Sequence, residues 1–203
     1  MKKILCYGDS NTYGYNPADS SRFDEETRWT ALLQNNLADG YEVIEEGACD
    51  RTAFVDNDKG FLFSAQRHFP KLLAKTNSVD ILVFALGTND MQFKYDISFG
   101  AVERGLENLI SSAKSKFKKI IIIPPVVLSD NVLSGFFNFQ FDGTSIVKSK
   151  KIGKIYRHIA RVYDCKIFDI NKFAQPSDAD GLHYDSAAHK LIADKLSELI
   201  RNI

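Results

Sequence analysis

Short apolar runs alternate along the chain with longer stretches in which apolar residues recur at helical spacing. The runs are rich in isoleucine, valine and phenylalanine and predict five strands, at Lys3–Tyr7, Tyr41–Glu45, Asp80–Leu86, Lys119–Pro124 and Lys166–Ile170. The third and fourth runs are apolar throughout, as strands covered on both faces must be, so they are expected near the centre of the sheet. This alternation predicts the α/β fold class, with a central five-stranded parallel sheet covered by helices.

The stretches between the strands predict helices, at Trp29–Leu37, around Phe69–Ala74, and at Gly100–Lys116, Lys148–Tyr163 and Ser186–Ile200. In the last of these the apolar residues fall near helical spacing, so one face is expected to pack on the sheet. No internal repeat, low-complexity tract or linker interrupts the pattern, and a length of 203 residues fits one globular domain. We therefore predict a single domain over residues 1–203.

One region between Leu128 and Thr144 does not follow the alternation. It holds four phenylalanines among loop residues, namely Phe136, Phe137, Phe139 and Phe141. These rings either pack into the core beneath a loop, or form an apolar wall of a pocket or a contact between subunits, because exposed apolar patches usually mark binding surfaces. The sequence leaves both interpretations open.

The charges of the chain cancel, because 26 lysine and arginine residues stand against 26 aspartate and glutamate residues. No overall field therefore favours a nucleic acid or an anionic membrane as partner, and small-molecule chemistry becomes the better hypothesis. The apolar run after Met1 is too short for a signal peptide, and no stretch approaches the length of a membrane span. The three cysteines are widely spaced, which suits reduced thiols, so we expect a soluble, cytoplasmic protein.

Polar side chains follow four of the five predicted strands. Ser10 comes after the first strand, Asp50 after the second and Asn89 after the third, while Asp180 and His183 follow the fifth. In an open α/β sheet the ligand crevice lies beyond the carboxyl ends of the strands, so these side chains are expected to meet. Singly, each has a simpler explanation, since a serine or an asparagine can cap a helix and an aspartate can bond a nearby histidine within a loop. Their joint occurrence favours one shared site.

These residue types match the needs of acyl transfer: a nucleophile, a base, a group that orients the base, and donors for the oxyanion. Ser10 is the candidate nucleophile, His183 the base, and Asp180 the residue that orients the imidazole. The side-chain N–H of Asn89 and the main-chain N–H of Ser10 can donate to the oxyanion. This chemistry needs no cofactor and no metal ion.

Neighbouring residues offer three alternatives that we do not favour. Cys49 could act as a thiol nucleophile, but nothing beside it in the sequence supplies a dedicated base. Asp178 could replace Asp180, although it precedes the histidine by five residues instead of three. A zinc site is the third alternative, but its two histidines are six residues apart, which does not place them on one helical face. Its ligands would be Asp180, His183, Asp185 and His189.

Three blocks of the chain, in this order, resemble the GDSL esterase family, also called SGNH hydrolases. They are Gly8-Asp9-Ser10-Asn11, Gly87-Thr88-Asn89-Asp90 and Asp180-Gly181-Leu182-His183. The resemblance implies a flavodoxin-like three-layer α/β/α sandwich with Ser10, Asp180 and His183 as its triad. Asn11 replaces the usual leucine of the first block. Further segments are similar to the bacterial arylesterase and acyltransferase branch, namely Tyr13-Gly14-Tyr15, Arg28-Trp29-Thr30, Val43-Ile44-Glu45-Glu46-Gly47 and Arg51-Thr52.

The chain departs from the family pattern in the second block. The family usually places a glycine two residues before a threonine and uses its main-chain N–H for the oxyanion, whereas Asp50 occupies that position here. Because the donor is a main-chain group, any residue except proline can supply it if its backbone angles permit. We therefore expect Ser10, Asp50 and Asn89 to form the oxyanion hole. We also expect the Asp50 carboxylate to point out of the pocket, with Arg51 or another cation to neutralise it.

The resemblance implies a serine esterase that cleaves short, acetyl-type carboxylic esters through an acyl-enzyme, and acyl transfer to an alcohol is a second outcome of that intermediate. Asn11 and Tyr13 are the expected substrate-binding residues. Related esterases often form dimers or larger assemblies, so a homo-oligomer is expected. The partners expected are a small-molecule ester and further copies of the chain, with neither nucleic acid nor membrane. Two alternatives stay open: a carbohydrate O-acetyl esterase of the same fold, and a non-catalytic flavodoxin-like protein that binds a small ligand.

Overall fold

The computed structural model describes residues 1–76 and 79–203. Within them, five strands form one sheet: β1 (Lys2–Gly8), β2 (Tyr41–Gly47), β3 (Ile81–Ala85), β4 (Lys119–Ile122) and β5 (Lys166–Ile167). Their order is β2-β1-β3-β4-β5, and every neighbouring pair is parallel. The predicted α/β class with a five-stranded parallel sheet is confirmed, with β3 at the centre and β4 beside it.

Two strands, β4 and β5, end two or more residues before the ends of the apolar runs that predicted them. β4 ends at Ile122 although its apolar run continues, because Pro124 and Pro125 have no main-chain N–H for the ladder. β5 has only two residues, since it is an edge strand that pairs with β4 alone before the chain enters a 3-10 helix at Ile170–Lys172. The segments after both strands therefore leave the sheet early and run over its carboxyl edge.

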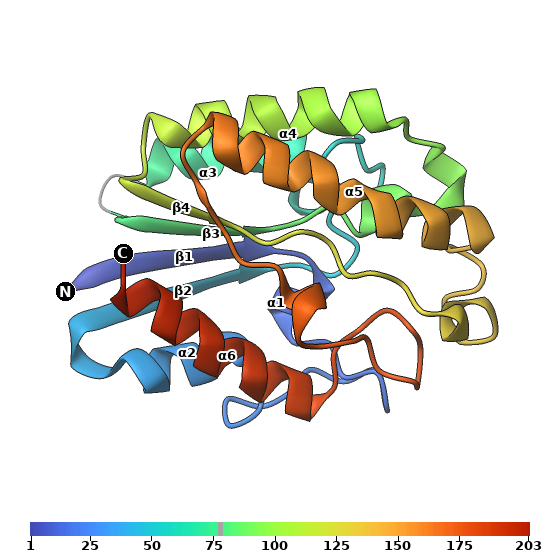
Figure 1. Cartoon of the computed structure of the whole chain (residues 1–203), viewed down its shortest axis with the longest axis horizontal. Helices are drawn as coiled ribbons and strands as arrows, with labels where there is room; N and C mark the ends of the chain where they lie inside the picture. Colours follow the sequence, from blue (N-terminus) through green and yellow to red (C-terminus); the bar gives the residue numbers. More distant parts are fainter. Residues whose placement is uncertain (77–78) are drawn as a thin grey trace.

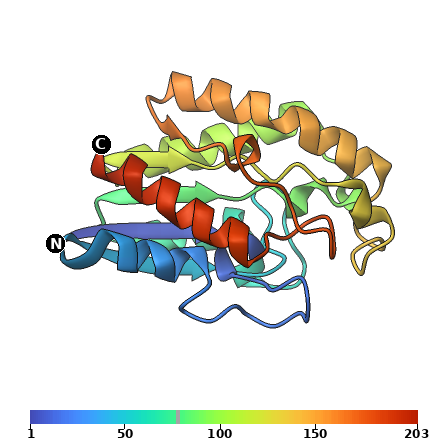
Figure 2. The same ribbon diagram turned by 60° about the horizontal axis from the view of Figure 1, so that its bottom comes forward.

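Helices cover both faces of the sheet (Figures 1 and 2). α2 (Trp29–Leu37) and α6 (Ser186–Arg201) lie on one face, and α3 (Ala65–Lys75), α4 (Phe99–Lys114) and α5 (Gly143–Val162) on the other. The short helix α1 (Ser10–Tyr13) follows β1 directly. The result is the three-layer sandwich that the family resemblance implied.

Short 3-10 helices join these elements, at Ala38–Gly40, Phe61–Phe63, Asn89–Met91, Phe93–Tyr95, Asp130–Leu133 and Ile170–Lys172. None of the helices in the described part of the chain combines the length and the apolar character needed to cross a lipid bilayer.

α5 begins at Gly143, earlier than the predicted start at Lys148. Its first turn has few apolar residues and starts with a glycine, so the spacing of apolar positions did not indicate a helix there. The carboxylate of Asp142 accepts the main-chain N–H of Ser145 at 3.0 Å, and the hydroxyl of Ser145 accepts the N–H of Asp142 at 3.2 Å. This capping box stabilises the amino end of the helix.

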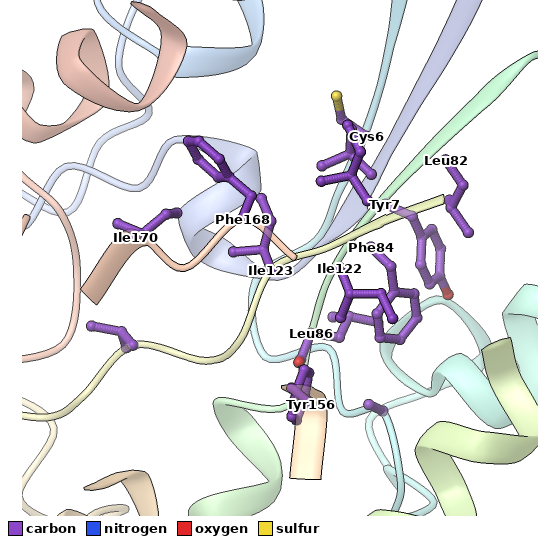
Figure 3. Packing of buried hydrophobic residues seen from close by; sticks show 14 of the residues in the cluster. Cys6, Tyr7, Leu82, Phe84, Leu86, Ile122, Ile123, Tyr156, Phe168 and Ile170 are labelled. Atoms are coloured by element: carbon purple, nitrogen blue, oxygen red, sulfur yellow. The ribbon is translucent and has the colours of Figure 1, made fainter. Parts of the chain in front are cut away.

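The core between the sheet and the helices α3 and α5 positions the ends of the inner strands (Figure 3). Tyr7 of β1 and Phe84 of β3 are fully buried, with their ring centroids 6.3 Å apart. Tyr156 of α5 is equally buried and donates its hydroxyl to the carbonyl of Leu86 at 2.6 Å. A Cβ atom at Gly87 would lie 2.1 Å from that hydroxyl, and the φ angle there is +118°, so this turn after β3 requires glycine.

Candidate active site

Ser10 stands where β1 turns into α1. Gly8 ends the strand, and a Cβ atom there would lie 2.0 Å from Oγ1 of Thr12, so the turn requires glycine. Asp9 caps the helix, because its carboxylate accepts the main-chain N–H of Asn11 at 3.1 Å. Ser10 is the first helical residue, and its N–H is one of the donors that a helix leaves free at its amino end. Its hydroxyl and its N–H are thereby held at the carboxyl edge of the sheet.

The structure joins Ser10, His183 and Asp180 by hydrogen bonds. His183 Nε2 lies 2.8 Å from the hydroxyl of Ser10, and Nδ1 of the same ring lies 2.6 Å from Asp180 Oδ2. The other carboxylate oxygen accepts the main-chain N–H groups of Leu182 and His183, both at 2.9 Å. Gly181 makes this tight turn with a φ of +70°. With a proton on Nδ1, Nε2 is free to accept the proton of the serine hydroxyl.

Asp180 is held in its ionised form. Burial raises the pKa of this carboxyl, but the hydrogen bonds from His183 and from two main-chain N–H groups hold it below the usual value. Asp178 lies elsewhere, since it is exposed and its carboxylate accepts a hydrogen bond from the side chain of Asn131. The structure therefore places Asp180, and not Asp178, beside the imidazole.

A cavity of about 200 Å³ opens beside the serine and the imidazole. Aromatic side chains form much of its wall, and its lining residues are Ser10, Tyr15, Cys49, Asp50, Asn89, Phe136, Phe137, Phe139, Gln140, Leu182 and His183. The ring of Tyr15 lies 4.2 Å from that of His183, and the ring of Phe137 lies 5.2 Å from it. The four phenylalanines of the irregular region divide between core packing and a pocket wall. Phe141 is buried in the core, whereas Phe136, Phe137 and Phe139 line the cavity.

Asn89 presents an amide donor to this cavity. One Nδ2–H donates to the carbonyl of Arg51 at 3.1 Å, and Oδ1 accepts a hydrogen bond from Gln92 Nε2 at 3.3 Å. Together these bonds determine which way the amide faces. An amide nitrogen carries two hydrogens, so one N–H remains available toward the cavity that Asn89 lines.

Asp50 adopts the backbone conformation that explains the family's glycine. Its φ angle is +61°, a left-handed conformation that costs a non-glycine residue roughly 1 kcal/mol. Its main-chain N–H donates to no group among the described residues, and the residue lines the cavity. Its carbonyl accepts a hydrogen bond from Asn57 Nδ2 at 2.8 Å, which holds the conformation.

The partner of the Asp50 carboxylate is Lys59, with which it forms an ion pair. Arg51, the neighbour considered first as a neutralising cation, is buried and points into the protein. Its guanidinium donates to the carbonyls of Gly8 at 3.1 Å and Glu46 at 2.6 Å, at the carboxyl ends of β1 and β2. The nearest residue in sequence is therefore not the one that balances this charge.

Asp90 has a structural role that the sequence analysis missed. Its buried carboxylate accepts the main-chain N–H groups of Ala53, Phe54 and Val55, at 2.7, 2.6 and 3.0 Å. Burial raises its pKa to about 6, although these three donors act in the opposite direction. The bonds tie the loop that carries Asp50 to the end of β3. The feature of the sequence that could have indicated this role is an aspartate directly after Asn89 at the end of a buried strand. A buried carboxylate there must accept hydrogen bonds from nearby donors.

Asn11 and Tyr13, the expected substrate-binding residues, lie outside the cavity beside Ser10. The Asn11 side chain accepts the main-chain N–H of Tyr184 at 3.1 Å, and its Nδ2 lies 3.4 Å from the carbonyl of Leu182. The main-chain carbonyl of Asn11 accepts the indole N–H of Trp29 at 2.9 Å. Asn11 thus links α1 to the loop that carries the histidine, because its amide is committed to main-chain partners. Tyr13 lines an adjoining cavity.

The two remaining alternatives find little support in the geometry. Burial raises the pKa of Cys49 to about 11, so its sulfur is a neutral thiol at ordinary pH. Residues 1–76 and 79–203 contain no cluster of three or more histidine, cysteine, aspartate or glutamate side chains that could hold a metal ion. Asp185 instead caps α6, and Nδ1 of His189 accepts the main-chain N–H of Trp29 at 3.1 Å.

A serine, an imidazole and a carboxylate joined in this order on an α/β scaffold define the class of serine hydrolases. The chain belongs to the GDSL-like lipase/acylhydrolase family, whose model matches residues 6–191. The resemblance noted in the sequence is therefore confirmed, and the protein is a GDSL/SGNH esterase or acylhydrolase.

Solved structures with the same architecture superpose on this chain over nearly its whole length. The inhibitor-bound aryl esterase of M. smegmatis superposes with a TM-score of 0.91 at 26% identity, covering 100% of this chain and 99% of that one. A carbohydrate acetylesterase family member from Sinorhizobium meliloti has a TM-score of 0.89 at 29% identity, with coverage of 99% and 98%. No curated protein of similar sequence was found.

Proposed function

We propose that the protein is a serine esterase that hydrolyses short, acetyl-type carboxylic esters through an acyl-enzyme. The observation that carries the proposal is the hydrogen-bonded series from Ser10 through His183 to Asp180, which opens on a cavity of about 200 Å³. The likeness to the M. smegmatis aryl esterase supports simple aryl esters as substrates.

The arrangement accounts for each step of hydrolysis. Ser10 Oγ attacks the acyl carbon while His183 Nε2 takes the hydroxyl proton, and Asp180 stabilises the resulting imidazolium. The carbonyl oxygen becomes an oxyanion that accepts hydrogen bonds from Asn89 Nδ2 and from the main-chain N–H groups of Ser10 and Asp50. The carbon–oxygen bond to the alcohol then breaks, and His183 returns the proton to the leaving oxygen. Water then attacks the acyl-enzyme through the same steps and releases the carboxylic acid, whereas an alcohol in place of water yields a new ester.

Acyl length is expected to limit the rate, because the cavity beside Ser10 is small and bounded by aromatic rings. On p-nitrophenyl esters from acetate to decanoate, we expect kcat/KM to be highest for acetate or butyrate and to fall for the longest chains. Release of p-nitrophenolate measures the rates. Equal rates at every length would place the acyl chain outside this cavity. No turnover of any ester, together with no labelling by a fluorophosphonate, would favour a non-catalytic binding protein.

The charge of Asp50 is expected to have little influence on the rate. Asp50→Asn should change kcat for p-nitrophenyl acetate by less than about tenfold, because its carboxylate is paired with Lys59 and partly exposed to solvent. Asp56→Asn is a matched control, since Asp56 lies on the same loop but outside the cavity and pairs with Arg67 of α3. A much larger increase would mean that the carboxylate opposes the oxyanion, and a collapse of kcat would mean that it takes part in catalysis. Either result contradicts the proposed orientation.

A carbohydrate O-acetyl esterase is the second candidate function. The Sinorhizobium meliloti structure supports it, and so does a second cavity next to the catalytic one. Acyl transfer, cytoplasmic location and homo-oligomeric assembly stay predictions. The free state of Cys6, Cys49 and Cys165 is consistent with a reducing compartment.

A further inference from the structure

Arg51 is the largest fully buried side chain in the described part of the chain, with an exposed fraction of 1%. Its Nε donates to the carbonyl of Leu62 at 2.8 Å, and its Nη2 donates to the Glu46 carboxylate at 3.0 Å. Nη1 donates to the carbonyls of Gly8 and Glu46, as described above. The guanidinium carbon lies 4.5 Å from the centroid of the Tyr7 ring. Four of the five guanidinium N–H groups are thus bonded, which fixes the side chain in one orientation.

These bonds join the loop after β2 to the carboxyl ends of two strands. Gly8 is the last residue of β1 and stands two residues before Ser10, and Glu46 is the last but one residue of β2. Within the loop, the main-chain N–H of Arg51 donates to the carbonyl of Ala48 at 3.2 Å. The guanidinium therefore connects this loop to the strand that leads into the nucleophile.

The main chain of Arg51 is adjacent to two of the three expected oxyanion donors. Asp50, directly before it, has the left-handed φ of +61° and supplies a main-chain N–H. The carbonyl of Arg51 accepts the Nδ2–H of Asn89 at 3.1 Å. Because a carbonyl only accepts, this bond requires the nitrogen of the Asn89 amide, and not its oxygen, to face Arg51. The third donor is the N–H of Ser10, close to the Gly8 carbonyl that the guanidinium binds.

Packing alone does not explain a buried cation at this position. Burial of a guanidinium is costly unless its N–H groups are bonded, and an apolar side chain of similar volume would fill the space without that cost. An apolar side chain could not bind main-chain carbonyls at fixed distances and directions, as the planar guanidinium does. Such precision matters at an oxyanion hole, because a misplacement of about 1 Å can cost roughly 100-fold in rate.

We propose that Arg51 is a positioning residue that aligns the three donors of the oxyanion hole. The inference rests on the proposed esterase function, and it gives Arg51 a role other than neutralising the charge of Asp50. The guanidinium holds the loop against β1 and β2, and the carbonyl orients the amide of Asn89. Arg51 does not line the cavity beside Ser10, so it acts through the donors and not on the substrate.

Two substrates that differ in one atom test this role. p-Nitrophenyl acetate develops its negative charge on oxygen, whereas p-nitrophenyl thionoacetate develops it on sulfur, which accepts hydrogen bonds more weakly. The ratio of the two kcat/KM values, oxygen ester over thionoester, therefore measures how well the donors engage. Both substrates release p-nitrophenolate and are measured on one preparation, so partial loss of folded protein does not alter the ratio. Asn89→Ala, which removes one donor, should lower the ratio by about tenfold.

Arg51→Met should lower the ratio by about tenfold as well, with kcat for p-nitrophenyl acetate reduced by roughly 100-fold and KM little changed. Arg51→Lys keeps the positive charge but lacks the planar fork, so it should recover part of the loss, with a ratio about threefold below that of the wild type. In the double variant Arg51→Met/Asn89→Ala the ratio should fall little further, because the amide is already misaligned. If Arg51→Met does not fold, the measurement on Arg51→Lys decides.

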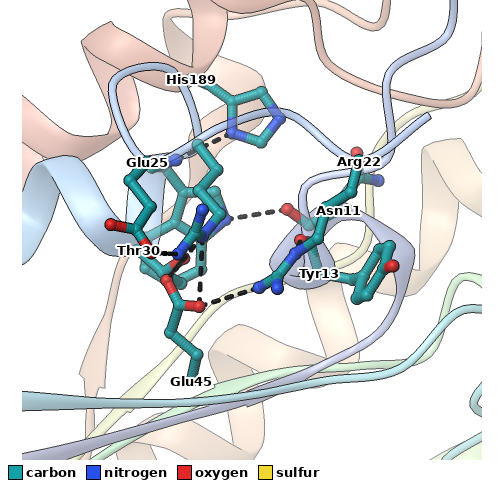
Figure 4. Close-up of polar contacts among 9 residues, drawn as sticks. Asn11, Tyr13, Arg22, Glu25, Thr30, Glu45 and His189 are labelled. Atoms are coloured by element: carbon teal, nitrogen blue, oxygen red, sulfur yellow. Dashed lines mark hydrogen bonds and ion pairs between the residues drawn. The ribbon is translucent and has the colours of Figure 1, made fainter.

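Arg28→Met is the matched control, because Arg28 is a second buried, ion-paired arginine. In the polar network of Figure 4, Arg28 donates to Glu45 at 2.8 Å and to Glu25 at 3.2 Å. Both partners are carboxylates and neither lines the cavity beside Ser10. Arg28→Met should therefore lower the melting temperature and leave the ratio unchanged.

Three results would overturn the assignment while the wild-type protein still hydrolyses p-nitrophenyl acetate. One is an unchanged ratio in the Arg51 variants. Another is an equal fall of the ratio in Arg28→Met, because loss of stability would then account for the effect. The third is an unchanged ratio in Asn89→Ala, because the donor that Arg51 orients would then not engage the oxyanion. If the wild-type protein hydrolyses no ester at all, the proposed function itself fails.

Discussion

Ser10→Ala is expected to lower kcat for p-nitrophenyl acetate by roughly 10⁴- to 10⁶-fold, the range seen when a member of a catalytic triad is removed. The hydroxyl that His183 Nε2 approaches at 2.8 Å is lost, whereas the main-chain N–H of residue 10 and the cavity walls are kept. The melting temperature should change little, because the hydroxyl's side-chain partner is the imidazole and the capping of α1 is made by Asp9. Rates of p-nitrophenolate release and circular dichroism melting measure the two effects.

The control for this prediction is Ser111→Ala, which removes an exposed serine hydroxyl on α4 and should leave kcat unchanged. Labelling by a fluorophosphonate should be found on Ser10 in the wild-type protein and be absent from Ser10→Ala. Substantial hydrolysis by a folded Ser10→Ala protein would refute the assignment. If that residual activity were then lost in Cys49→Ala, the nucleophile would be the neighbouring thiol.

Asn89→Ala is expected to lower kcat by roughly 10²- to 10³-fold with little change in KM, because an oxyanion donor acts mainly in the transition state. The free Nδ2–H is removed, and the oxyanion keeps only main-chain donors. The variant also loses a hydrogen bond to the carbonyl of Arg51, so some loss of stability should accompany the kinetic effect. Steady-state kinetics and urea unfolding of the same preparation give both quantities.

The rival role for Asn89 is that of a helix cap. That role predicts a loss of about 1 kcal/mol of unfolding free energy with kcat preserved. Asn89 begins the 3-10 helix Asn89–Met91, yet its side chain bonds to Arg51 and Gln92 and not to a main-chain N–H of that helix. Asn35→Ala, at an exposed position of α2, is the control for asparagine removal in general. Preserved kcat in a destabilised Asn89→Ala protein would exclude the oxyanion role.

Local patterns predicted much of the fold. The apolar spacing that indicated a helix at Trp29–Leu37 matches α2, and the uninterrupted apolar run from Asp80 matches the central strand β3. The errors fall at the ends of elements, where the apolar pattern does not mark the boundary. The start of α5 depends on the side-chain cap at Asp142, and the end of β4 depends on two prolines that are themselves apolar. In both cases one or two residues decide, and a pattern read over many residues does not detect them.

The sequence by itself determined the fold class and the family, and it singled out Ser10, Asn89, Asp180 and His183, because each stands in a short block next to a predicted strand or helix. It could not supply the distances between them, since Ser10 and His183 are separated by 173 residues. Only the tertiary structure showed that Asp50 pairs with Lys59 and that the Asp90 carboxylate accepts three main-chain N–H groups. It also showed that Tyr13 lines a second cavity, together with Arg22. The physical reason is that these contacts join loops at the carboxyl edge of the sheet. Loop positions follow from how strands and helices pack, and neither residue propensity nor spacing within one segment records that packing.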